Sequence, residues 1–133
     1  MRNLFYSLFT IITIMTMPAG CKKDSHPPVV PEEDLKISID AASYTLTPGP
    51  SFDFQLKVES AMPAGGVRIQ YSVIGELDNQ VYPQGPTITT HDNITRMNIS
   101  GLPRQKICVC TISVTSTATA TNTAITSFRV GYK

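Results

Sequence analysis

Apolar and polar residues alternate one by one along most of the chain after residue 34. In the segment 52–58, four apolar residues are separated by Asp53, Gln55 and Lys57. Successive side chains of a strand point to opposite faces, so this period of two indicates strands with one buried face. An apolar period of 3.6, typical of helices, is absent after Met17. We therefore expect seven strands, at 35–39, 52–58, 67–73, 87–90, 95–100, 106–116 and 124–132.

Proline and glycine clusters separate these segments. They lie at 48–50, 63–66, 83–86 and 101–103, where the missing N–H of proline interrupts no strand ladder. About seven short strands with turn signals between them are typical of a two-sheet antiparallel sandwich. The sequence therefore predicts an all-β fold, with a single antiparallel β-sandwich domain over residues 35–133.

The segment Ile99-Ser100-Gly101-Leu102-Pro103 resembles the fibronectin type III and immunoglobulin-like superfamily. In that superfamily a leucine just after the fifth strand packs under the corner that leads into the sixth. The resemblance implies an immunoglobulin-like sandwich in which Leu102 is buried at this corner.

Residues 1–20 have the pattern of a secretion signal. Arg2 supplies a positive charge, and an apolar segment of 14 residues follows at 4–17. As a helix it would rise roughly 21 Å, less than a bilayer core of about 30 Å, so we expect a signal peptide and no lasting membrane span.

The segment Met17-Pro18-Ala19-Gly20-Cys21 resembles the lipobox of bacterial lipoproteins. The resemblance implies that the mature chain begins at Cys21 and that its thiol and amine are acylated, which anchors the protein in a membrane. The alternative is an ordinary secretion signal cleaved after Ala19, with Cys21 as a simple thiol.

Residues 21–34 are expected to form the lipidated cysteine and a proline-rich tether. At about 3.1 Å per residue, such a tether could hold the domain up to roughly 40 Å from its anchor. Its start, Lys22-Lys23-Asp24, resembles that of many lipoproteins of the Bacteroidota. This resemblance implies an outer-membrane location in the cell envelope and favours display at the cell surface over the inner face.

Charge and composition exclude several classes of function. The chain of 133 residues has 11 Lys and Arg against 10 Asp and Glu, with 41% hydrophobic residues. Loss of Arg2 with the leader leaves ten against ten. Zero net charge excludes the basic footprint of a nucleic-acid-binding protein and also disfavours wholesale disorder.

Cys108 and Cys110 lie two positions apart on one predicted strand. Their Cα atoms should be about 6.6–7 Å apart, at the limit for a disulfide. Apart from Cys21 in the lipobox-like segment, the other metal-ligand candidates of the His/Cys type are His91 and, in the tether, His26, so no zinc spacing is formed. We expect both thiols to be buried as small hydrophobic groups in the inner row of the strand.

The sequence contains no pattern of catalytic residues. His91 and Asp92 lie in a polar segment between strands, which favours a turn over a general base or metal ligand. The sequence therefore indicates no enzyme, no cofactor and no metal, and a hydrolase or metal-binding protein is the least favoured interpretation.

Two loops are candidates for partner contact. The connection 75–86 contains Leu77 and Tyr82, an apolar and an aromatic residue of the kind that binding surfaces use. Tyr82 could equally cap the core. The segment Ser116–Thr123 is rich in serine and threonine and is interpreted as a solvated turn, with partner contact as its alternative.

Together these features predict an envelope-anchored lipoprotein with a non-catalytic module for binding, adhesion or assembly. The membrane is then one partner, through the lipid anchor, and an envelope protein or a glycan is another. The alternative is a structural accessory subunit of an envelope complex, with an edge strand that pairs with a neighbour.

Overall fold

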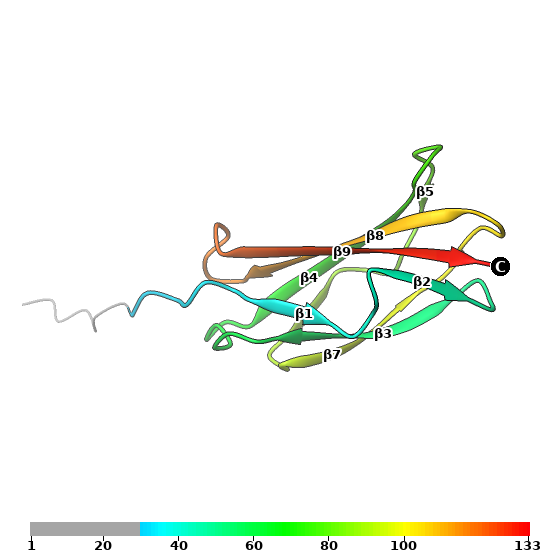
Figure 1. Ribbon diagram of the computed structural model, residues 1–133. Helices are drawn as coiled ribbons and strands as arrows, with labels where there is room; N and C mark the ends of the chain where they lie inside the picture. The colour runs from blue at the N-terminus through cyan, green and yellow to red at the C-terminus, as the bar shows by residue number, and fades with distance from the viewer. Residues whose placement is uncertain (1–29) are drawn as a thin grey trace, which may run out of the picture.

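The computed structural model describes residues 30–133, which form nine strands and no helix (Figure 1). The predicted leader, Cys21, His26 and most of the predicted tether lie outside the described residues. Within residues 30–133, no helix is long and apolar enough to cross a bilayer. The strands are β1 (Ile37–Ile39), β2 (Tyr44–Thr47), β3 (Phe52–Val58), β4 (Val67–Gly75), β5 (Val81–Tyr82), β6 (Ile88–Thr90), β7 (Ile94–Ile99), β8 (Ile107–Ser116) and β9 (Thr123–Tyr132).

The strands form two sheets, which confirms the predicted all-β sandwich. The smaller sheet has the order β1-β3-β7, and the larger has the order β2-β9-β8-β4-β5, with β6 also paired to β4. Strands β1, β3 and β7 thus occupy the places of strands A, B and E of an immunoglobulin-like sandwich. Strands β4, β8 and β9 occupy those of C, F and G. All strand pairs are antiparallel except β2 with β9, which is parallel.

The core lies between the two sheets and follows the alternation seen in the sequence. In β8 every second residue is buried, so Cys108 and Cys110 are fully enclosed as expected. Leu102, expected to be buried at the corner before β8, is 4% exposed. Phe54 of the smaller sheet meets Phe128 of the larger in an edge-to-face contact, with ring centroids 5.1 Å apart. Such aromatic pairs add to the apolar burial that holds the sheets together.

Two short strands were not predicted from the sequence. Strand β2 has four residues and lies in parallel beside the end of β9, where Tyr44 is paired with Arg129. Strand β5 has two residues and pairs antiparallel with the end of the long strand β4, where Val81 lies beside Ile74. Segments this short carry too little periodicity to be recognised, because their conformation is fixed by pairing with distant strands.

The last residues of the predicted tether are hydrogen-bonded to the domain. The Glu32 carboxylate accepts hydrogen bonds from Ser116 Oγ at 3.1 Å and Asn122 Nδ2 at 3.2 Å. The Glu33 carboxylate accepts one from the backbone N–H of Ala61 at 3.0 Å. The hydrogen bond from Ser116 is the main cause that lowers the pKa of Glu32. Both glutamates therefore belong to the folded domain.

The sandwich has two distinct ends (Figure 1). At the proximal pole the chain enters beside the β8–β9 loop, 117–122, which carries the predicted serine- and threonine-rich turn. At the distal pole lie the β4–β5 loop, 76–80, the β7–β8 loop, 100–106, and the C-terminus. The predicted contact loop is thus at the end of the domain opposite the entry of the tether.

Candidate binding surface

A row of side chains crosses the outer face of the larger sheet near the distal pole. The strand register places Tyr44, Arg129, Val109, Ile74 and Val81 side by side on β2, β9, β8, β4 and β5. Side chains directly opposite each other in a sheet lie on the same face. The exposed fractions of Tyr44, Ile74 and Val81 are 43%, 36% and 57%. The row is therefore largely apolar and open to solvent.

Further along the same face, towards the proximal pole, the composition changes. The positions that follow on the outer face of β8 and β9 are mostly hydroxyl residues, with one exposed isoleucine at 125. The hydroxyl residues are Thr111, Ser113, Thr115, Thr123 and Ser127. The exposed apolar side chains of this sheet thus gather mainly at its distal end.

Two ion pairs fix the β4–β5 loop above this row. Arg129 Nη2 lies 2.5 Å from Glu76 Oε2, and Lys106 Nζ lies 2.6 Å from Asp78 Oδ2. The Arg129 guanidinium also lies over the Tyr44 ring, 5.7 Å from its centroid. The hydrogen bond from Lys106 lowers the pKa of Asp78, and the hydrogen bond to Glu76 raises the pKa of Arg129.

Leu77 lies between these two ion-paired acids and is 95% exposed. Its backbone is held on both sides, because the N–H of Glu76 also donates to the carbonyl of Ile107 at 2.9 Å. Ordering the backbone of a contact loop in advance lowers the entropy cost of binding a partner. Leu77 therefore fits the predicted role of a contact residue.

Tyr82, the second predicted contact residue, has a different position. It is half-buried and packs against the core of the domain. The sequence left open whether Tyr82 contacts a partner or caps the core. Its contacts in the structure are those of a residue that caps the core. The structure thus brings Leu77, but not the Tyr82 ring, to the exposed part of this surface.

Two adjoining hollows lie at the distal pole, and Leu77 lines the first of them. One, of about 370 Å³, is lined by Leu77, Lys106 and Ile107 with Glu76, Asp78 and Gln105. The other, of about 380 Å³, shares Gln105, Lys106 and Ile107 and extends to Tyr44 and Leu46 on β2. We define the distal surface as the apolar residues Tyr44, Leu46, Ile74, Leu77, Val81, Ile107 and Val109 with the paired charges Glu76, Asp78, Lys106 and Arg129.

The backbone around the first hollow has an unusual conformation. Among the described residues other than glycine, only Asn79 and Gln105 have a positive φ, of 54° and 58°. One lies in each of the two loops that border the hollow. Residues in this left-handed region cost free energy, and they persist where the surrounding structure holds them. Sequence reasoning missed Gln105, because glutamine is not a residue that signals such a conformation.

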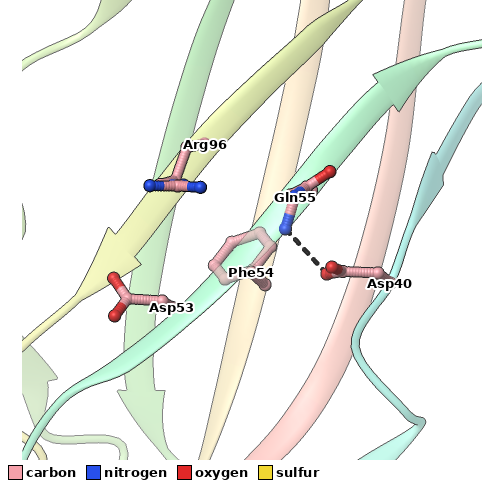
Figure 2. Close-up of a pocket in the computed structure, with 5 residues that line it drawn as sticks. All are labelled: Asp40, Asp53, Phe54, Gln55 and Arg96. Carbon is pink, nitrogen blue, oxygen red and sulfur yellow. Dashed lines mark hydrogen bonds between the residues drawn. The ribbon is translucent and has the colours of Figure 1, made fainter.

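A third hollow, of about 360 Å³, lies on the outer face of the smaller sheet (Figure 2). It is lined by Phe54, whose ring points into the core and is 2% exposed, and by the outward neighbours Asp53 and Gln55. Asp40 Oδ1 accepts a hydrogen bond from the backbone N–H of Gln55 at 2.7 Å, so that carboxylate is already bonded within the fold. This hollow is shallow and polar, and we place no binding site in it.

The other candidate chemical groups are dispersed. His91 lies exposed near the proximal pole, and the N–H of Asp92 donates to Thr90 Oγ1 at 3.0 Å, which is the bonding of a turn. Burial raises the pKa of both internal thiols, that of Cys110 to about 12, so the nucleophilic thiolate is not formed at neutral pH. No group of His, Cys, Asp and Glu within residues 30–133 is arranged to hold a metal ion.

Comparison with protein-family models, curated proteins and solved structures found no match for this chain. Its function is therefore inferred from the residues themselves, and membership of the immunoglobulin-like and lipoprotein families stays a prediction.

Proposed function

We propose that this protein is a lipid-anchored lipoprotein of the bacterial cell envelope that binds a partner through the distal surface of a non-catalytic immunoglobulin-like domain. The observation that carries the proposal is Leu77, which is 95% exposed and held between two ion-paired acids. An exposed aliphatic side chain gains free energy when a partner buries it, and the charges beside it are already paired within the domain.

The position of the surface supports the same function. The chain reaches the domain at the proximal pole, whereas Leu77 lies at the distal pole (Figure 1). In a protein anchored at Cys21, the distal surface therefore faces away from the end of the domain where the anchor attaches. The predicted location is the outer membrane, with display at the cell surface.

The chemistry of the surface favours a protein as the partner, with a glycan as the alternative. Exposed aliphatic side chains such as Leu46, Ile74 and Leu77 gain free energy by burial against another apolar surface. The four charged side chains of the distal surface are already joined in ion pairs, which leaves them fewer free positions for hydrogen bonds to sugar hydroxyls.

Lipidation is tested by metabolic labelling with palmitate. Label should enter the wild-type chain and a Cys108→Ala control, and it should be lost from Cys21→Ser, because only Cys21 stands in the lipobox-like segment. Label that remains on Cys21→Ser refutes the anchor.

Partner binding is tested with Leu77→Ala. Binding to envelope proteins, measured by reciprocal co-purification, should fall at least tenfold, while Thr111→Ala on the same sheet should have no effect. Binding to a glycan array that depends on Leu77 would identify the alternative partner. Binding of either kind that is insensitive to Leu77→Ala refutes the distal surface.

The second candidate is a structural accessory role, in which an edge strand pairs with a neighbouring subunit. The observation that favours it is the open edge of β7, the last strand of the smaller sheet. Co-purification that is lost when this edge is blocked, and unaffected by Leu77→Ala, would support the accessory role over the binding module.

A further inference from the structure

Strand β7 is the longest strand with an unpaired edge in the described part of the chain. It has six residues and pairs only with β3, whereas the edge strands β1, β2, β5 and β6 have three, four, two and three residues. Short edge strands resist association, but a longer unprotected edge is a template for pairing with another chain. It contains neither proline nor lysine.

Hydrogen bonds at the two ends of β7 show which backbone groups point outward. The carbonyl of Asn93 accepts a hydrogen bond from the N–H of Val58 at 2.8 Å, so the backbone groups of residue 93 point towards β3. Ser100, seven positions later, faces the opposite way, because its N–H and carbonyl are bonded to the side chain of Gln84. Backbone groups alternate along a strand, so the N–H and carbonyl groups of Ile94, Arg96 and Asn98 point away from β3.

The Gln84 amide takes the place of a neighbouring strand at the end of this edge. Its Oε1 accepts from the N–H of Ser100 at 3.1 Å, and its Nε2 donates to the carbonyl of Ser100 at 3.0 Å. The outward backbone groups of Ser100 thus already make the hydrogen bonds that a neighbouring strand would make. The part of the edge left open among the described residues runs from Ile94 to Asn98.

The charges beside this edge determine which strand fits it. Arg96 and Asp53 lie on the same face of the smaller sheet (Figure 2), and Arg96 belongs to none of the ion pairs formed by the described residues. Asp53 stands beside Asn98 in the register and accepts a hydrogen bond from Asn98 Nδ2 at 2.8 Å. Asp53 and Asn98 thus form a cross-strand row of side chains that ends at the open edge. The Asp53 carboxylate in this row would attract a cationic side chain on a neighbouring strand.

We propose that β7 pairs antiparallel with β7 of a second copy of this chain, about a two-fold axis at Met97. In this register Arg96 lies opposite Asn98 of the second copy and continues the row that begins at its Asp53. The two-fold axis creates the same favourable arrangement twice. New backbone hydrogen bonds form between residues 96 and 98 of the two copies, because Gln84 already bonds the groups of Ser100 that lie opposite Ile94. This short ladder joins the two three-stranded sheets.

Electrostatics distinguishes this register from its neighbours. Pairing about Arg96 would place two arginines directly opposite each other, which is destabilising. Pairing about Thr95 would place Arg96 opposite Ile94, whose row continues to Lys57. Of these three registers, only the one about Met97 places the arginine in a row that contains a carboxylate. This inference is independent of the distal surface, which lies on the other sheet.

The register is tested by cysteine cross-linking of the full chain in cells. Cα atoms of a directly opposed pair are about 5.5 Å apart, within the range of a disulfide, whereas a shift by two residues exceeds it. Co-expression of Arg96→Cys and Asn98→Cys chains should give a disulfide-linked dimer, and neither variant alone should.

Three results would overturn the proposal. They are efficient cross-linking of Arg96→Cys with itself, no cross-linked product at all, and a product whose mass shows a different protein joined to β7. The last result would show that another strand occupies this edge.

Self-association is measured by sedimentation velocity on the detergent-solubilised full chain. Asn98→Pro removes an outward N–H without removing a backbone bond to β3, so it should weaken the dimer at least tenfold, while Asn98→Thr should stay within a few-fold of wild type.

Arg96→Glu should weaken the dimer about tenfold, and Asp53→Arg in the same chain should restore it. Arg68→Glu, on the other sheet, is the charge control.

Correct folding of each variant is shown by the protection of Cys108 and Cys110 from thiol reagents. Folded Asn98→Pro that dimerises as well as wild type, or Arg96→Glu that is not restored by Asp53→Arg, refutes pairing through β7.

Discussion

Asn122 Nδ2 donates a hydrogen bond to the Glu32 carboxylate across 90 positions of the sequence. The same amide group donates to the carbonyl of Glu33 at 3.0 Å, and Asn122 Oδ1 accepts from the N–H of Leu35 at 2.9 Å. One side chain thus bonds three residues of the entering segment, Glu32, Glu33 and Leu35. It joins this segment to the loop that connects β8 and β9.

Asn122→Ala should lower the free energy of unfolding by about 1–3 kcal/mol, because it leaves the backbone N–H of the buried Leu35 without its partner. Hydrogen exchange at Leu35 should become faster in the folded state. Denaturant unfolding followed by circular dichroism measures the first effect and native-state exchange the second. The neighbouring exposed Thr121→Ala is the control, and an equal loss of stability in both variants would contradict the role of Asn122.

Gln105→Gly should stabilise the protein by about 0.5–1 kcal/mol. Glycine adopts the positive φ of 58° without the cost that a side chain carries, and this gain exceeds the added entropy of the unfolded chain. Gly101→Ala is the opposite test, since φ is 70° there and an added Cβ would meet no atom within 4 Å. We expect it to destabilise by about 1 kcal/mol. A change of the same sign in both variants, measured by denaturant unfolding, would contradict this account.

The buried thiol of Cys110 should make stability depend on alkaline pH. Burial raises its pKa from 9.0 to about 12, so the unfolded chain loses this proton at a lower pH than the folded one. The contribution is therefore fully present below pH 9 and is lost as the pH rises towards 12. Cys110→Ala should have a smaller fall in melting temperature between pH 8 and about 10.5 than wild type. An identical fall in the two proteins would show that other groups cause it.

Phe54→Ala should destabilise the domain by about 3–5 kcal/mol, because the ring is 2% exposed and contacts Phe128 between the sheets. Phe52→Ala should cost less, since Phe52 is only partly buried. Thermal unfolding of the two variants checks this order. A larger loss for Phe52→Ala would place the centre of the core elsewhere.

The fold was predictable from the sequence where a strand was long enough to show its alternation. The segment 52–58 coincides with β3, and the inner row of β8 contains Cys108 and Cys110 as expected. The corner leucine, Leu102, is also buried as the resemblance implied. These features depend on neighbours in the sequence.

The features that were missed depend on pairing between distant segments. The row from Tyr44 to Val81 exists only because five strands align in a particular register, which alternation alone does not specify. Glu32 resembled a solvated tether residue, because its partner Asn122 lies at the far end of the chain. The exposed position of Leu77 was predictable from its loop, but the ion pairs that hold it were not.

Attachment of Glu32 at one pole and exposure of Leu77 at the other determine how the domain carries mechanical load. For a chain held at Cys21 and pulled by a partner at the distal surface, tension runs lengthwise along the strands (Figure 1). The inter-strand hydrogen bonds lie perpendicular to that direction. They are therefore sheared together and not opened one after another, an arrangement that suits a domain placed under tension between a membrane and its partner.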